Sequence, residues 1–261
     1  MAKVRSNDGT VIAYDKKGQG PNLIIVLGAL NKRGSGKRLA KLLEDHFTVI
    51  TYDRRGRGDS TDNLPYSTDK EVEDIDALVG ELGGQAYLYG HSSGAILALL
   101  AAKKLADKVE GIALYEVPYD SDHAAQKASE KYKKELELLL NEGRNGDAVS
   151  LFVKSVGVTD KQIAAMKRLP MWKGLTSMAP TLAYDTIELM ELYPDIDVHA
   201  VSTPALVMYG ADSPAFMGRT AKELSKKMRN AQLKKLQGQW HDVKPDVLAP
   251  ALNEFFSKKT S

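Results

Sequence analysis

Short apolar runs rich in β-branched residues alternate with helical stretches along most of this chain, and this alternation constrains the fold most. The clearest run is Leu23-Ile24-Ile25-Val26, in which every side chain is apolar, as in strands that are buried on both faces. Further apolar runs lie at 47–52, 86–89, 111–115 and 205–209, and most are followed by a helical pattern. Repeated units of this kind predict an open, mostly parallel α/β sheet flanked by helices.

The two ends of this pattern add strands of other kinds. At the start, Asn7-Asp8-Gly9 separates two β-capable segments at 2–5 and 10–15, which is typical of a hairpin. We expect this hairpin to form an antiparallel edge of the sheet. Near the end, residues 232–236 predict a short final strand, followed by a loop and a helix that runs through Leu248 to Phe256.

The alternation breaks between Pro118 and about Val201, where helical patterns occur without a convincing buried strand. We therefore expect a core domain of residues 1–118 and 202–261, with residues 119–201 inserted into it as a helical cap. Adaptable or aromatic side chains of this insertion are candidates to line a pocket, although most of them would fill the cap's own core. They are Met166, Met171, Trp172, Met178, Tyr184 and Met190.

Composition narrows the class of partner. The 261 residues are 43% hydrophobic and 27% charged, with 36 Lys and Arg against 34 Asp and Glu. A net charge of +2 gives little support to a nucleic-acid or membrane surface, so we expect a small-molecule substrate. The chain has no cysteine, which excludes disulfides and a thiolate nucleophile. Without an apolar leader at the N-terminus, a cytoplasmic location is expected.

Gly90-His91-Ser92-Ser93-Gly94 lies where the strand at 86–89 gives way to a helical run. This is the G-x-S-x-G pattern in its strand, turn and helix context, which predicts that Ser92 is raised above the sheet as a nucleophile. The helix that follows would aim its first N–H groups at the site. The backbone N–H of Ser93 is therefore one expected oxyanion donor. An ordinary helix start is the structural alternative.

A serine hydroxyl needs a neighbouring base, usually an imidazole that a carboxylate holds in position. Of the five histidines, His241 fits best because it follows the last expected strand. The loop that carries it opens at the same end of the sheet as Ser92. Two carboxylates, each following an expected strand, compete to orient His241. Asp212 comes after the strand at 205–209, in a segment that would also suit an Asx turn, and Glu116 comes directly after the strand at 111–115.

With these residues the chain resembles the α/β-hydrolase family, in which nucleophile, acid and histidine occur in the order of Ser92, Asp212 and His241. That order favours Asp212 over Glu116. The segment Asp53 to Ser60 also resembles the family's Asp-x-x-Gly-x-Gly-x-Ser pattern. The cap is placed as in members that resemble cofactor-free haloperoxidases, enol-lactonases and meta-cleavage-product hydrolases. The resemblance implies an α/β-hydrolase fold that needs neither a metal nor an organic cofactor.

One departure from the family lies after the strand that ends near Leu27. Many members carry His-Gly there, whereas this chain reads Leu27-Gly28-Ala29-Leu30. The resemblance implies that the backbone N–H of Ala29 is the second oxyanion donor, although the missing histidine leaves the anchoring of this loop open. Gly28 and Leu30 join Met171, Trp172 and Met178 as candidate pocket residues.

Serine rather than aspartate at position 92 favours acyl transfer over the chemistry of haloalkane dehalogenases and epoxide hydrolases. We therefore expect a serine hydrolase that cleaves an ester, lactone or related carbonyl substrate through an acyl-enzyme on Ser92. Hydrolysis of a C–C bond or a lyase reaction with the same triad remains an alternative. A non-catalytic small-molecule receptor on a hydrolase fold is another.

Overall fold

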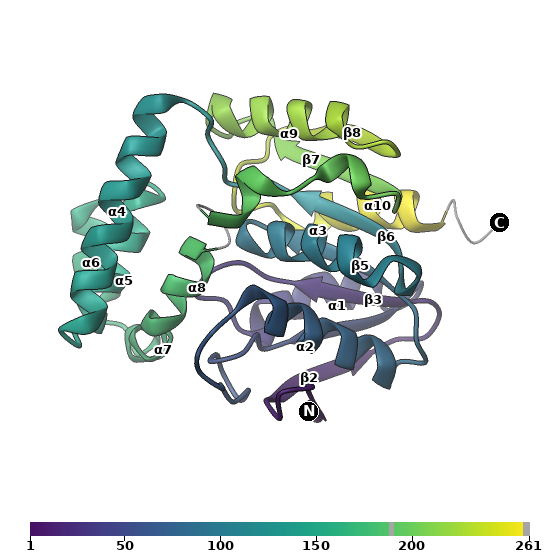
Figure 1. The fold of residues 1–261 in the computed structure, drawn as a ribbon, viewed down its shortest axis with the longest axis horizontal. Helices are drawn as coiled ribbons and strands as arrows, with labels where there is room; N and C mark the ends of the chain where they lie inside the picture. Colours follow the sequence, from purple (N-terminus) through teal and green to yellow (C-terminus); the bar gives the residue numbers. More distant parts are fainter. Residues whose placement is uncertain (188–190, 258–261) are drawn as a thin grey trace.

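An eight-stranded sheet forms the centre of the computed structural model, which describes residues 1–187 and 191–257 (Figure 1). The strand order is β1-β2-β4-β3-β5-β6-β7-β8. Neighbours from β4 to β8 are parallel, whereas β2 is antiparallel to both β1 and β4. The expected mostly parallel sheet is confirmed. The strands are β1 (Ala2–Arg5), β2 (Val11–Lys17), β3 (Asn22–Val26), β4 (Thr48–Tyr52), β5 (Ala86–His91), β6 (Val109–Tyr115), β7 (Ala205–Gly210) and β8 (Ala231–Leu236).

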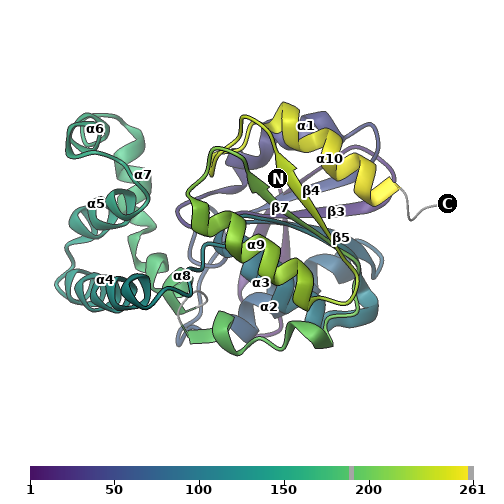
Figure 2. The ribbon, with the colours of Figure 1, turned by 90° about the horizontal axis from the view of Figure 1, so that it is seen from above.

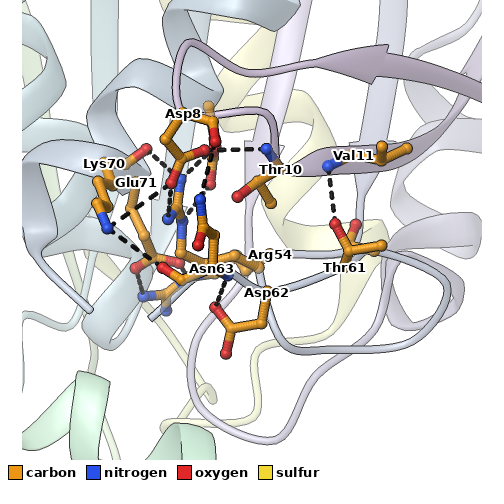
Figure 3. Close-up of polar contacts among 12 residues, drawn as sticks. Asp8, Thr10, Val11, Arg54, Thr61, Asp62, Asn63, Lys70 and Glu71 are labelled. Carbon is orange, nitrogen blue, oxygen red and sulfur yellow. Dashed lines mark hydrogen bonds and ion pairs between the residues drawn. The ribbon is translucent and has the colours of Figure 1, made fainter. Parts of the chain in front are cut away.

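The N-terminal hairpin forms one edge of this sheet, as expected. Its turn places Gly9 at φ +88, a conformation that favours glycine. Several hydrogen bonds join the hairpin to the segment after β4. Among them, Asn63 Nδ2 donates to the carbonyl of Asp8 at 2.8 Å, and the Val11 N–H donates to Thr61 Oγ1 at 2.9 Å (Figure 3). The two sheet edges, β1 and β8, carry exposed cationic side chains, namely Lys3, Arg5 and Lys235.

Helices cover both faces of the sheet (Figure 2). One face packs against α1 (Lys37–Leu43) and α10 (Pro245–Ser257), and the other against α2 (Thr68–Glu81), α3 (Ser93–Leu105) and α9 (Ala215–Lys227). Strand β3 shows why its run is apolar throughout. Leu23 and Ile25 enter one core, while Ile24 and Val26 enter the other, because successive side chains of a strand point to opposite faces.

Five α-helices connect β6 to β7, and no strand lies between them among the described residues. Helices α4 to α7 stand to one side of the sheet (Figures 1 and 2) and build a separate apolar cluster around Leu136 and Val149. Among residues 1–187 and 191–257, no helix has the length and apolarity that crossing a membrane requires. The five helices are α4 (His123–Asn141), α5 (Asn145–Ser155), α6 (Asp160–Met166), α7 (Met171–Ser177) and α8 (Leu182–Ile187).

Candidate active site

Ser92 lies at a sharp turn between β5 and α3, with φ +58 and ψ −128. The flanking glycines make this turn sterically possible. A Cβ on Gly90 would lie 2.5 Å from Cα of Ala95, and one on Gly94 would overlap the carbonyl of Val26. Such contacts exclude any larger residue at either position. Ser92 is partly exposed, and its backbone N–H is tied to the carbonyl of Tyr115 at 3.0 Å.

The loop after β3 runs beside this serine. A Cβ added to Gly28 would lie 2.9 Å from Cβ and 3.4 Å from Oγ of Ser92, so only glycine leaves the serine undisturbed. Ala29 follows and is partly buried, and Leu30 is held at φ +54. The structure thus brings both residues whose N–H groups we expect to donate to an oxyanion, Ala29 and Ser93, to the neighbourhood of Ser92.

The histidine of the site is oriented by Glu116. Nδ1 of His241 lies 2.8 Å from Oε2 of Glu116. Since an ionised carboxylate only accepts hydrogen bonds, Nδ1 is the donor of this pair, and Nε2 is the ring nitrogen that Glu116 leaves unoccupied. Glu116 follows β6 directly, and its carboxylate extends across the end of the neighbouring strand β7, toward the loop after β8 that carries His241.

The carboxylate of Glu116 is buried yet fully hydrogen-bonded. Its Oε1 accepts the N–H of Gly210 at 2.8 Å and the hydroxyl of Ser213. Burial tends to raise the pKa of Glu116, but the hydrogen bonds from His241, Ser213 and Gly210 outweigh it and keep the pKa below its ordinary value. The group therefore stays ionised and retains His241 in one tautomer.

Asp212 does not occupy the place that chain order predicted for it. It is exposed, its backbone N–H donates to the carbonyl of Gln239 at 2.9 Å, and the carboxylate bonded to His241 is that of Glu116. The preference for Asp212 as the orienting acid is therefore corrected. Asp212 stands in a surface turn beyond β7, whereas Glu116 leaves its strand at once and has one more methylene with which to reach the imidazole.

Two side chains at the ends of β5 and β6 hold the loop that carries His241. His91 Nε2 donates to the carbonyl of His241 at 2.9 Å, and the Tyr115 hydroxyl donates to the carbonyl of Trp240 at 2.6 Å. Desolvation and the nearby His241 lower the pKa of His91 to about 4, so this ring is a neutral donor. Within the described part of the chain, no hydrogen bond joins Ser92 Oγ to His241; such bonds often tighten only with substrate.

The expected pocket residues fall in different places. Leu30 and Met178 are buried in the apolar cluster of the inserted helices, and Trp172 packs against it beneath Lys167. Met171 is exposed on α7, and Met190 lies outside the described residues. An open hollow of about 700 Å³ is lined by Trp172 and Arg144 among others, but not by Ser92 or His241. Gly28 is the candidate at which an added Cβ would meet Ser92.

Sequence reasoning missed a polar residue beside the site, Arg57. This buried arginine donates to the carbonyl of Gly28 at 2.9 Å, and it anchors the loop that lacks the family's histidine. The only signal was a charged residue at a variable position of the Asp-x-x-Gly-x-Gly-x-Ser segment. No group of three or more potential metal-binding side chains occurs among residues 1–187 and 191–257.

Comparisons with known proteins agree with this fold. Residues 33–251 match the family model described as the alpha/beta hydrolase family. An alpha/beta hydrolase from Sphaerobacter thermophilus is 42% identical with a TM-score of 0.86, over 98% of this chain and 100% of that chain. A thermophilic esterase from Thermogutta terrifontis is 20% identical with a TM-score of 0.74, over 98% of both chains. An enol-lactonase from Burkholderia xenovorans is 20% identical with a TM-score of 0.70, over 98% of this chain and 100% of that chain.

Proposed function

Because this chain belongs to the alpha/beta hydrolase family, we propose that it is a serine hydrolase acting through Ser92, His241 and Glu116. Its substrate is an ester, a lactone or a related carbonyl compound. The observation that carries this proposal is the hydrogen bond of 2.8 Å between His241 Nδ1 and Glu116 Oε2, at the carboxyl ends of the parallel strands, where Ser92 follows β5. A buried carboxylate that fixes the tautomer of an imidazole is the arrangement that serine activation requires.

The reaction follows from these positions. Ser92 Oγ attacks the substrate carbonyl while His241 Nε2 takes the hydroxyl proton, and the carbonyl oxygen becomes an oxyanion held by the N–H groups of Ala29 and Ser93. Collapse of this intermediate breaks the ester bond. His241 gives its proton to the leaving alcohol, and Ser92 remains acylated. His241 then takes a proton from water as that water attacks the acyl carbonyl. When this second intermediate collapses, the bond to Ser92 Oγ breaks, His241 returns the proton to Oγ, and the acid product leaves the free serine.

We also propose that the inserted segment, residues 119–201, acts as a cap that sets substrate size. Its helices join the core near the loop after β3, since Leu30 of that loop packs into their apolar cluster. The esterase and the enol-lactonase that share this fold are consistent with carbonyl substrates of either kind.

A fluorophosphonate probe tests the activated serine. We expect the probe to label folded wild type and to stop labelling it after acid denaturation. Ser92→Ala should remain unlabelled although it is folded. Ser150→Ala is the matched control. It removes a hydroxyl from α5, far along the chain from the turn at Ser92, and should label normally. Absence of labelling in folded wild type would contradict the proposal and favour a receptor on the same fold.

The substrate class needs a separate measurement. p-Nitrophenyl esters of increasing acyl length, a set of lactones and a C–C bond substrate such as a β-diketone are compared by kcat/KM. We expect ester or lactone turnover that is lost in Ser92→Ala. Turnover of the β-diketone alone would assign the same triad to C–C bond hydrolysis.

A further inference from the structure

A buried polar cluster joins helix α8 of the inserted segment to both sides of the candidate oxyanion site. Arg57 Nη2 donates to both carboxylate oxygens of Asp185 at 3.0 Å, and its Nη1 donates to the carbonyl of Gly28 at 2.9 Å. The hydroxyl of Ser93 donates to Oδ1 of Asp185 at 2.7 Å. Arg57, Asp185 and Ser93 are each at most 3% exposed, so solvent does not weaken these bonds.

The contact with Gly28 matters because of the peptide group to which its carbonyl belongs. The carbonyl of Gly28 and the N–H of Ala29 are parts of the same planar peptide group, and in a trans peptide they point in opposite directions. When Arg57 holds the oxygen, it also fixes the direction of the N–H. A cation bonded to the carbonyl further polarises the amide and makes its N–H a stronger donor.

The same carboxylate reaches the second donor residue. Ser93 supplies the other candidate oxyanion N–H, and its side chain is held by Asp185. Arg54 completes the cluster, with Nη1 at 3.0 Å from Asp185 and an ion pair to Glu71, both buried (Figure 3 shows Arg54 and Glu71). Asp185 therefore connects the two loops that would hold an oxyanion.

Stability alone gives a poor reason for such a cluster. Taking an arginine and an aspartate out of water costs several kcal/mol for each ion, and well-packed apolar residues would often serve the fold equally well. A rigid guanidinium that bonds Asp185 through Nη2 and the carbonyl of Gly28 through Nη1 instead gives geometric precision, which oxyanion binding requires.

We propose that Arg57 is a positioning residue of the oxyanion site, which holds the Gly28–Ala29 peptide with its N–H toward the substrate oxygen, and that Asp185 fixes Arg57 in this position. The inference rests on the proposed function. It assigns to α8 of the inserted segment a role in transition-state stabilisation as well as in covering the site.

The test compares Arg57→Met with wild type on the best ester. Loss of an entire oxyanion donor costs about 100- to 1,000-fold in kcat, so a donor that is only misdirected should cost about 10- to 100-fold. KM should change by less than about threefold, because the ground state does not use this contact. A trifluoromethyl ketone, which forms a tetrahedral adduct with the serine, should lose affinity by the same factor as kcat/KM.

Arg55→Lys is the matched control. Arg55 is buried in the same segment and pairs with Asp74 at 2.7 Å, and its other hydrogen bonds go to Asp8 and the carbonyl of Lys70. This variant should lose thermal stability and keep kcat. In NMR spectra the amide proton of Ala29 should move upfield in Arg57→Met and stay in place in Arg55→Lys. If Arg57→Met does not fold, Asp185→Asn, which keeps the side-chain shape, should shift the same signal and lower kcat.

The outcomes separate this inference from the proposed function. If folded wild type is not labelled at Ser92 by a fluorophosphonate, both fail. If wild type is labelled, and ketone affinity and the Ala29 signal are unchanged in the folded Arg57 or Asp185 variant, this inference alone is wrong. A loss of kcat that Arg55→Lys reproduces would also overturn it, because the effect would then reflect general destabilisation.

Discussion

Glu116 adopts a backbone conformation that is unusual for a residue other than glycine, with φ +50. Ser92 and Leu30 share this feature, at φ +58 and +54, and all three follow strands of the sheet at the candidate site. Each such residue costs of order 1 to 3 kcal/mol and persists only where its surroundings impose it. Ala106, at φ +33 at the end of α3, shows the same feature away from the site. The other three gather at the candidate site, where such strain is a reason to propose function.

At the level of single residues, the acid of the proposed triad can be identified by paired substitutions. Glu116→Gln removes the charge that holds His241 in its tautomer, and we expect kcat to fall by about 10,000-fold, as removal of this charge does in serine proteases. Asp212 is exposed, and in the described part of the chain the carboxylate hydrogen-bonded to His241 is that of Glu116, so Asp212→Asn should remain within about threefold of wild type. Steady-state hydrolysis of an active ester measures both; the reverse ranking would restore Asp212 as the acid.

Gly28 offers a second residue-scale prediction. Because an added Cβ would lie 2.9 Å from Cβ of Ser92, Gly28→Ala should displace the serine or the loop and lower kcat by about 100-fold, the effect of a misplacement near 1 Å. Gly34→Ala, where an added Cβ meets nothing within 4 Å, is the control. Equal kcat in the two variants would show that this loop does not approach the nucleophile.

At the scale of elements, the histidine loop depends on strands that are distant in sequence. Tyr115 of β6 and His91 of β5 hold consecutive carbonyls of the loop after β8. Tyr115→Phe removes one of these bonds, and the net contribution of such a bond to stability is about 1 kcal/mol. We therefore expect a decrease of about that size in the free energy of urea unfolding, with a several-fold lower kcat. An unchanged kcat would mean that His91 alone positions the loop.

The sequence predicted the elements better than the contacts between their ends. The runs at 23–26 and 205–209 became β3 and β7, and the Asp8-Gly9 turn became the expected hairpin, because burial pattern and turn chemistry are local properties. The choice between Glu116 and Asp212 was not local. It depends on how far each side chain reaches across the end of β7, and spacing along the chain does not contain that distance.

Arg57 illustrates the same limit more strongly. Its partners, Gly28 and Asp185, lie 29 and 128 positions away along the chain, and a charged residue in a polar segment is usually solvated. The sequence indicates the burial of Glu116 more clearly than that of Arg57, since Glu116 lies between Tyr115 and Val117 directly after an apolar strand. A carboxylate in that setting needs a partner, and this argument favours Glu116 independently of chain order.

For the whole molecule, His91 links stability to pH. Its pKa is lowered to about 4 in the folded state and is near 6.5 when unfolded, so below pH 6.5 the unfolded chain binds a proton that the fold rejects. Stability should be complete above pH 6.5 and fall as pH decreases toward 4, by about 2 kcal/mol at pH 5. Urea unfolding measures this loss. His91→Gln keeps a hydrogen-bond donor that does not titrate, so its stability should fall less than that of wild type between pH 6.5 and 5. His46→Gln, at an exposed position, should lose as much stability as wild type.

The charged edges of the sheet have a consequence for how copies of the molecule meet. A parallel sheet that is open at both sides presents unpaired backbone groups, which invite continuation by another chain. Here the edge strand β1 carries Lys3 and Arg5, and the edge strand β8 carries Lys235. Pairing β1 with β1, β8 with β8 or β1 with β8 of another copy therefore brings cations together. Crowded molecules thus repel one another along the directions in which strand-by-strand fibre growth would otherwise begin.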